Sequence, residues 1–294
     1  MSINYREFIH PEDEAARQQL EAVPGFQTVT KYFMELGIEK FYHGLFMAEK
    51  IRLSPTQLPE LYGLLPPICG KFGITEPEFY LEMSPEPNAY TMGDKQAFLV
   101  VTSGLLAHVG NNDELTAVLA HECGHILCRH VFYRTMASLI VYAADSLGMI
   151  GNLAMPVELA LNYWSRRSEL SADRAELVYL GNSEPVVNVL VRLSGGPAGI
   201  TGKLNIEEYT AQARYYQDMQ NSKWHKILQS AAIMNRQHPF AAVRINEILK
   251  WEKSAQYRRL HGILHSSAAG RQCPGCGKEA DENAKFCRFC GQKL

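Results

Sequence analysis

Residues 120–126 read Ala-His-Glu-Cys-Gly-His-Ile, which places the pattern H-E-x-x-H at His121, Glu122 and His125. On a helix, residues four apart lie within about 40° of each other around the axis, so both imidazoles can reach one metal ion. Glu122 does not need to bind the metal, because a carboxylate at this position can take a proton from a metal-bound water and pass it to the leaving group. This stretch therefore predicts a zinc-dependent hydrolytic site on a helix.

The surrounding residues favour that helix. Asn112 or Asp113 can cap its amino-terminal end, where Asp113 and Glu114 also complement the helix dipole. Apolar residues for burial recur along it at Leu115, Val118, Leu119, Ile126 and Leu127.

Two nearby side chains are not expected to reach the metal. On a continuing helix His130 is rotated by about 140° from His125, so we expect it to point away as an ordinary surface or core residue. Cys123 is rotated by about 200° from His121, which predicts that it packs in the interior.

A third ligand is predicted from the segment Trp164–Arg174, in which Glu169 and Asp173 lie four residues apart. On one helical face, Glu169 can bind zinc while Asp173 accepts a hydrogen bond from the far nitrogen of a ligating histidine. The alternative is a solvated face whose acids pair with neighbouring arginines. Those arginines are Arg166, Arg167 and Arg174.

The chain resembles the HtpX-like gluzincin metallopeptidases, a family that also includes the membrane CAAX prenyl endopeptidases. Four segments carry the resemblance, which covers about residues 5 to 260. They are Asn88-Ala89-Tyr90-Thr91-Met92-Gly93, the motif from His121 to His125, Ser165-Arg166 through Glu169 to Asp173, and His238-Pro239-Phe240 with Arg244 and Ile245. The resemblance implies a predominantly helical α+β zincin fold with a small β-sheet.

The same resemblance implies roles for residues outside the zinc motif. A peptide substrate would lie along the strand that contains Asn88 and Ala89, with Arg244 also contributing to substrate binding. His238 would donate a hydrogen bond to the oxyanion of the tetrahedral intermediate. By composition alone, Asn88 is also typical of a turn between prolines, and a His-Pro pair is typical of a helix start.

The local sequence is compatible with such a sheet. Residues 97–102, Ala-Phe-Leu-Val-Val-Thr, favour a strand, and Pro85 and Pro87 within Met83–Met92 are typical of an exposed edge. An edge strand can accept an extended peptide through main-chain hydrogen bonds, which fits a peptide or unfolded-protein substrate.

The chain differs from many members of that family in the segment Thr135–Trp164. Polar residues and a proline interrupt it, so it predicts a buried helical hairpin rather than a membrane span of about twenty apolar residues. The interrupting residues are Asp145, Asn152, Pro156 and Glu158. The amino terminus shows no signal peptide, and we therefore expect a cytoplasmic protein with no integral membrane span.

Composition fits a globular enzyme. The 294 residues are 46% hydrophobic and 20% charged, with a net charge of −2, which provides no electrostatic footprint for nucleic acid. Three of the seven cysteines are scattered in apolar surroundings, as in a reducing compartment, and the other four are grouped at the carboxyl end.

Those four cysteines form the pairs Cys273–Cys276 and Cys287–Cys290, separated by ten residues. Paired C-x-x-C knuckles predict a structural zinc site that supplies most of the folding energy of so short a segment. A redox dithiol pair is the alternative. The segment resembles a short zinc ribbon. Because its charges nearly balance, we expect this ribbon to contact proteins or dock substrate rather than bind nucleic acid.

The sequence thus predicts three parts: a metallopeptidase domain at residues 1–262, a linker at 263–272 and a zinc ribbon at 273–294. The expected function is a zinc endopeptidase with two Zn²⁺ ions, one catalytic and one structural. A catalytically idle binding or adaptor protein on the same fold and a prenyl-protein protease remain alternatives. Glu122 disfavours the first, and the missing membrane spans disfavour the second.

Overall fold

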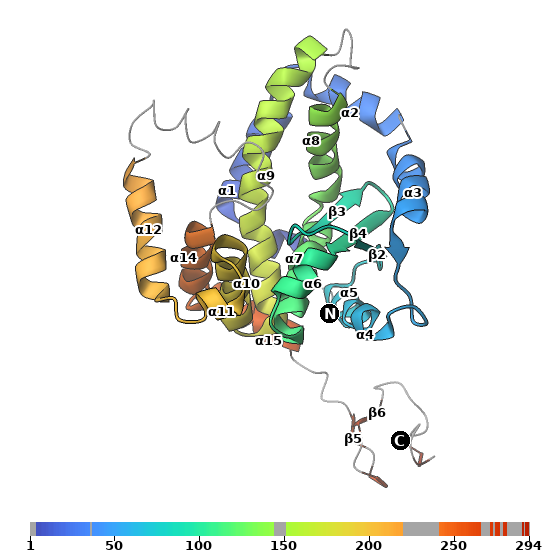
Figure 1. The fold of residues 1–294 in the computed structure, drawn as a ribbon, viewed down its shortest axis with the longest axis vertical. Helices are drawn as coiled ribbons and strands as arrows, with labels where there is room; N and C mark the ends of the chain where they lie inside the picture. Colours follow the sequence, from blue (N-terminus) through green and yellow to red (C-terminus); the bar gives the residue numbers. More distant parts are fainter. Residues whose placement is uncertain are drawn as a thin grey trace.

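The computed structural model describes residues 4–35, 37–143, 151–219 and 241–265, together with 271–272, 274–276, 279–280, 290 and 292–293. Helices dominate the fold (Figure 1). They are the short 3-10 helix η1 (Tyr5–Glu7), α1 (Pro11–Glu21), α2 (Phe26–Glu35), α3 (Ile38–Glu49), α4 (Pro59–Tyr62), α5 (Leu65–Phe72), α6 (Ser103–His108), α7 (Asn112–Leu127), α8 (Val131–Ala143), α9 (Gly151–Leu180), α10 (Glu184–Gly195), α11 (Ala198–Thr201), α12 (Ile206–Met219), α14 (Ala241–Glu252) and α15 (Ala255–His265). With the small sheet described next, they confirm the predicted mainly helical α+β fold.

The described sheet has four strands in the order β1-β2-β4-β3. These are β1 (Ile51–Arg52), β2 (Glu78–Glu82), β3 (Ala89–Gly93) and β4 (Ala97–Thr102). Strands β2 and β4 run parallel, whereas β3 pairs antiparallel with β4 and places Tyr90 opposite Val100. The strand predicted at residues 97–102 is confirmed with the same bounds. The predicted edge strand is also confirmed, although it begins at Ala89, after both prolines.

A tight turn at Gly93 joins the two strands next to the site. Gly93 has a φ of +123°, and a Cβ on it would lie 2.1 Å from the carbonyl oxygen of Gln96. Only glycine fits this turn without moving the backbone. The turn therefore pairs β3 with β4, and the strand order leaves β3 at the edge of the described sheet.

The long helix α9 is the central element of the molecule (Figure 1). It contacts α1, α2, α7, α8, α10, α14 and α15. The predicted hairpin corresponds to α8 and the start of α9. Because α9 continues to Leu180, this one helix also carries the acidic pair Glu169 and Asp173. Residues 144–150, with Asp145, lie outside the described residues.

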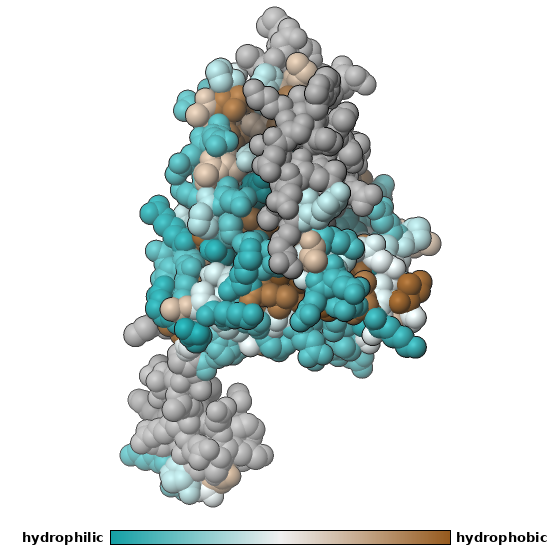
Figure 2. Space-filling view, turned by 90° about the vertical axis from the view of Figure 1, so that its left-hand side faces the viewer, coloured by the Kyte–Doolittle hydropathy of each residue, from teal (hydrophilic) through white to brown (hydrophobic). Residues whose placement is uncertain are grey.

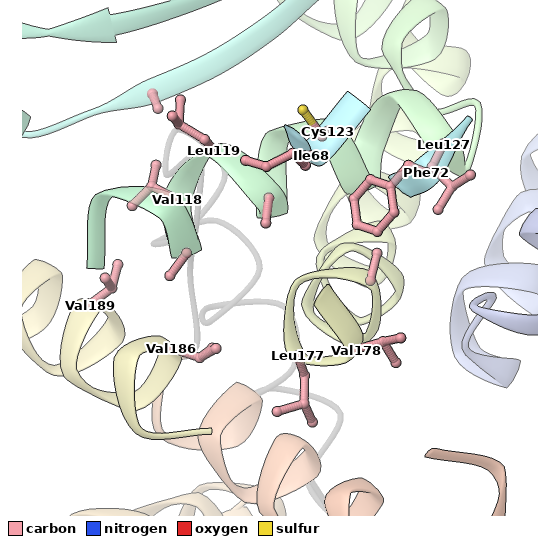
Figure 3. Packing of buried hydrophobic residues seen from close by; sticks show 14 of the residues in the cluster. Ile68, Phe72, Val118, Leu119, Cys123, Leu127, Leu177, Val178, Val186 and Val189 are labelled. Carbon is pink, nitrogen blue, oxygen red and sulfur yellow. The ribbon is translucent and has the colours of Figure 1, made fainter. Parts of the chain in front are cut away.

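Two clusters of buried apolar side chains hold these elements together. The first joins α7 to α5, α9 and α10, and Cys123 is fully buried within it, as predicted (Figure 3). Its labelled members are Ile68, Phe72, Val118, Leu119, Cys123, Leu127, Leu177, Val178, Val186 and Val189. The second cluster joins α1, α2 and α3 to the sheet, α8 and the first half of α9. Hydrophilic residues cover most of the coloured surface on the face shown in Figure 2.

Among the described residues, no helix has both the length and the apolar character needed to cross a bilayer.

Near the carboxyl end, β5 (Arg271–Gln272) and β6 (Glu279–Ala280) form an antiparallel pair on either side of Cys276. Cys276 and Cys290 are exposed, whereas Cys273 and Cys287 lie outside the described residues. Helix α15 continues to His265, past the predicted domain boundary at residue 262. The zinc ribbon remains a prediction.

Candidate active site

The zinc motif lies in the second half of α7. The helix is capped by the side chain of Asn111, which accepts a hydrogen bond of 2.9 Å from the backbone N–H of Glu114. The cap thus lies one residue before the predicted Asn112. Burial extends to polar residues as well, because His121, Glu122 and His125 are all at least 95% buried.

Gly124 brings α7 and α9 together inside the motif. A Cβ at this position would lie 3.0 Å from both the carbonyl oxygen of Ala172 and the Cβ of Ala175 on α9. These contacts are tighter than ordinary van der Waals packing, so a larger residue would push the helices apart. Small residues on both helices therefore allow Glu169 to approach the two histidines.

His121, His125 and Glu169 converge on a common point. Nε2 of His121 lies 3.3 Å from Oε2 of Glu169, and Nε2 of His125 lies 3.3 Å from Oε1 of the same carboxylate. Ligands at about 2.0–2.1 Å from a tetrahedral zinc ion lie roughly 3.3 Å from each other. Nε2 of His125 is buried and has no hydrogen-bond partner among the described residues. The donor set and its spacing thus fit a zinc ion.

The two histidines differ in charge preference. Burial alone would lower the pKa of His121, but Asp173, Glu169 and Glu176 outweigh burial and hold this pKa well above its usual value. Burial and the nearby charge of Arg134 hold the pKa of His125 well below its usual value. His125 is therefore neutral, the form in which imidazole binds metal, and the carboxylates beside His121 attract a cation.

Asp173 lies where the sequence predicted it, behind His121. Its Oδ1 is 3.1 Å from Nδ1 of His121, and Oε2 of Glu176 lies 3.4 Å from the same nitrogen. A carboxylate at this nitrogen keeps the proton there and leaves Nε2 available to the metal. Glu176 was not predicted to belong to the site, although it follows Asp173 by less than one helical turn.

Two buried arginines clasp the acidic residues. Arg244 on α14 donates to both oxygens of Asp173 at 2.9 and 2.5 Å, and its Nη1 lies 3.1 Å from Glu169. Arg134 on α8 donates to Oε1 of Glu169 at 2.5 Å. Arg244 was expected to bind substrate, and it does line the cavity next to the site, but its guanidinium is engaged by carboxylates. The two arginines thus hold Glu169 and Asp173 in place and offset their charge in the buried cluster.

Glu122 contacts β3 through a hydrogen bond. Oγ1 of Thr91 donates a 3.1 Å hydrogen bond to Oε2 of Glu122, and both residues are buried. The catalytic carboxylate predicted from the motif is thus oriented by the strand predicted to bind substrate. Thr91 was part of the recognised segment but had been given no role.

His130 is a buried residue and, among the described residues, belongs to neither group of candidate metal ligands, as expected, but the helical extrapolation did not predict its contact with His125. Its Nδ1 lies 2.9 Å from Nδ1 of His125, and it therefore points toward the predicted ligand. The reason is that α7 ends at Leu127 and Arg129 adopts a left-handed conformation with a φ of 61°. The chain reverses at that residue and returns His130 to the motif.

A cavity of about 550 Å³ opens onto His121 and Glu122. Asn88 and Ala89 line one wall, so the structure brings the predicted substrate-binding residues to the predicted catalytic ones. Another part of the wall is apolar and comes from α6, α7 and α10, whereas Glu86, Glu176 and Arg244 add charged groups. Its apolar residues include Leu105, Val118, Val189, Leu190 and Leu193. His238 lies outside the described residues.

Comparisons with known proteins agree with this geometry. The sequence profile of peptidase family M48 matches residues 67–252. Over 257 residues the chain is 33% identical to the plastoglobule-localized metallopeptidase 48, chloroplastic, of Arabidopsis thaliana, covering 86% of this chain and 74% of that protein. It is 27% identical over 218 residues to a protease HtpX homolog of Pelotomaculum thermopropionicum, covering 59% of this chain and 74% of that protein. The chain therefore belongs to peptidase family M48, as an HtpX-like metallopeptidase.

Proposed function

We propose that the protein is a zinc-dependent endopeptidase with His121, His125 and Glu169 as zinc ligands and Glu122 as general base. The observation that carries this proposal is the convergence of the three donor groups at 3.3 Å spacings beside a cavity that Glu122 also lines. A zinc ion bound there would supply Lewis-acid polarisation of a water molecule and of the scissile carbonyl.

Glu122 moves the protons of the reaction. As a carboxylate it accepts a proton from the attacking water and then passes it to the amide nitrogen of the leaving group. The hydrogen bond from Thr91 holds one carboxylate oxygen, which fixes the direction of the other. Asp173 and Arg244 keep His121 in a single tautomer and orientation.

The cavity supports a peptide or unfolded-protein substrate. Ala89 begins the edge strand β3 and Asn88 directly precedes it, and an extended chain can pair with such an edge through its backbone. The apolar wall formed by Leu105, Val189 and Leu190 favours an apolar side chain next to the cleaved bond.

The decisive experiment compares wild type with Glu122→Gln in a peptide-cleavage assay. The variant should retain zinc, because Glu122 is not a ligand. Its rate of hydrolysis should fall by about 10²- to 10⁴-fold, because the general base is missing. Glu114→Gln is a matched control, since Glu114 is a buried carboxylate on the same helix that pairs with Arg192 at 2.7 Å. Unchanged turnover in Glu122→Gln would refute the mechanism.

His238 remains our proposed oxyanion donor. If it acts in the transition state, His238→Ala should lower kcat about 10²-fold while KM, zinc content and melting temperature change little. A sharp drop in melting temperature with normal kcat would instead assign it a structural role.

We also propose that residues 273–294 form a zinc ribbon, joined by a linker to a peptidase domain that extends past the predicted boundary to the end of α15 at His265. The β5–β6 pairing around Cys276 supports a hairpin of the kind that presents zinc ligands. The full chain should then carry two zinc ions, and Cys276→Ser with Cys290→Ser should carry one. A wild-type content of one zinc contradicts the ribbon.

The cytoplasmic location predicted from the sequence stays a prediction. The Arabidopsis relative is named as chloroplastic and plastoglobule-localized, so fractionation of the native protein is the measurement that decides.

A further inference from the structure

A buried chain of side chains leads from His125 to the amino-terminal helix. Nδ1 of His125 lies 2.9 Å from Nδ1 of His130, and Nε2 of His130 lies 3.1 Å from Oδ2 of Asp13 on α1. All three side chains are at most 2% exposed. The chain thus connects the metal cluster to residues some 110 positions earlier in the sequence.

Asp13 is held rigidly at the end of this chain. Trp164 donates to its Oδ1 at 2.9 Å and Ser171 donates to its Oδ2 at 2.5 Å, both from α9. Ser171 in turn accepts a hydrogen bond of 2.9 Å from the backbone N–H of His10. Burial would raise the pKa of Asp13, but His130 and these hydrogen bonds outweigh it and keep the carboxyl ionised. A buried carboxylate with this many donors is a fixed acceptor.

The acceptor at one end determines the protons along the whole chain. Because Asp13 only accepts, His130 carries its proton on Nε2 and presents a lone pair at Nδ1. His125 must then carry its proton on Nδ1, which leaves the lone pair of its Nε2 directed at Glu169 and the metal position. The arrangement selects the one tautomer of His125 that can bind the metal.

We propose that Asp13 and His130 are positioning residues of the metal site, which orient His125 and fix its tautomer from outside the zinc motif. This proposal rests on the metal site of the proposed function. Asp13 precedes the segment 67–252 that matches the family profile, so the amino-terminal helix α1 completes the site from outside that segment. Neither Asp13 nor His130 touches the cavity.

The test measures zinc affinity by competition with a chromophoric chelator, together with the visible spectrum of the Co²⁺-substituted protein. Asp13→Asn and His130→Leu should each weaken zinc binding by about 10- to 100-fold, the usual effect of losing an outer partner of a metal-bound histidine. Both should also shift the cobalt bands. His130→Gln should recover most of the affinity, because an amide both accepts from His125 and donates to Asp13.

Glu114→Gln is the matched control for Asp13→Asn. Both carboxylates are 1% exposed, and Glu114, in the first turn of α7 and away from the zinc motif, accepts a 2.7 Å hydrogen bond from the backbone N–H of Gly110. This control should lower the melting temperature without changing zinc affinity.

Three results would overturn the proposal. The first is wild-type zinc affinity in Asp13→Asn, and the second is an equal loss of affinity in Glu114→Gln. The third is that Asp13→Asn and His130→Leu both fail to fold while Glu114→Gln folds and binds zinc. The last result would make the chain a folding element only. Absence of zinc binding at this site in the wild type is a separate outcome, since it refutes the proposed function itself.

Discussion

The two histidines of the zinc motif lie on the same face of α7 but are held from behind in different ways. The outer nitrogen of His121 faces two carboxylates, Asp173 at 3.1 Å and Glu176 at 3.4 Å. The outer nitrogen of His125 faces the imidazole ring of His130, and the carboxylate of Asp13 lies one residue further away. One histidine is therefore supported by direct charge and the other through a relay.

The difference also concerns where the supporting residues come from. Asp173, Glu176 and Arg244 belong to the segment 67–252 that defines the family match, whereas the relay ends outside it at Asp13. Support for His121 thus comes with the family's own segment, while support for His125 depends on how the amino-terminal helix packs against α9. Stability and zinc affinity should therefore be more sensitive to charge-changing substitutions beside His121 than to those beside His125.

The largest effect, a loss of stability on the His121 side, is expected for Arg244→Met. This substitution leaves Asp173 and Glu169 as buried carboxylates without their shared cation, so the free energy of unfolding of the zinc-free protein should fall by about 3–5 kcal/mol. Denaturant unfolding measures the loss. As a control, Arg17→Met breaks an exposed pair with Glu21 and should cost at most about 1 kcal/mol. Equal costs for both variants would show that Arg244 is not the charge that balances the His121 side.

The next effect compares the two outer carboxylates directly. Asp173→Asn should weaken zinc binding by about 10- to 100-fold and by more than Asp13→Asn, because Asp173 contacts its histidine without an intermediate ring. The losses should add in the double variant, since the two carboxylates act on different histidines. A larger loss for Asp13→Asn would reverse the comparison.

The sequence predicts the His121 side better than the His125 side, for a physical reason. Regular helical spacing places His121 and His125 on one face of α7, and Glu169 and Asp173 on one face of α9. The position of His130 depends on where α7 ends, and the left-handed Arg129 that ends it carries no glycine or proline signal.

Long-range partners of the site were likewise missed. Asp13, Arg134 and Thr91 each reach the cluster from a different element, and no local spacing connects them to the motif. Strand β4 shows the opposite case, because its run of β-prone residues defined both of its ends. Local pattern thus predicted elements and ligands, whereas their outer partners depended on tertiary packing.

A smaller effect is expected for Thr91→Val. This variant tests whether β3, which contacts Glu122, also influences zinc binding by the two histidines. The variant removes the hydrogen bond to Glu122 at constant shape, which should lower kcat roughly tenfold, or about 1.4 kcal/mol. Zinc affinity should not change, because the hydroxyl of Thr91 donates to Glu122, which is not a predicted ligand. Thr91→Ser keeps the hydroxyl and should retain most of the rate. A change in zinc affinity in Thr91→Val would show that β3 supports the metal as well as the base.

The smallest effect concerns Glu176, which has no counterpart on the His125 side. Burial, together with the charge of Asp173, raises its pKa from 4.5 to about 7 in the zinc-free protein, against the opposing influence of His121 and Arg244. Between these two pH values the unfolded chain is ionised at Glu176 while the folded protein still holds the proton. Stability from this group is therefore lost as pH rises from 4.5 to 7 and is constant above that range.

Glutamine cannot ionise, so Glu176→Gln should lack this loss. The melting temperature of the zinc-free variant, relative to zinc-free wild type, should rise between pH 5 and pH 8 by about 2–4 °C, or about 1 kcal/mol. The shift is modest because Glu176 lines the cavity, where water and local relaxation reduce the cost of the buried charge. A difference that is independent of pH would mean that Glu176 is ionised throughout, and that the His121 side holds one more negative charge for the metal to neutralise.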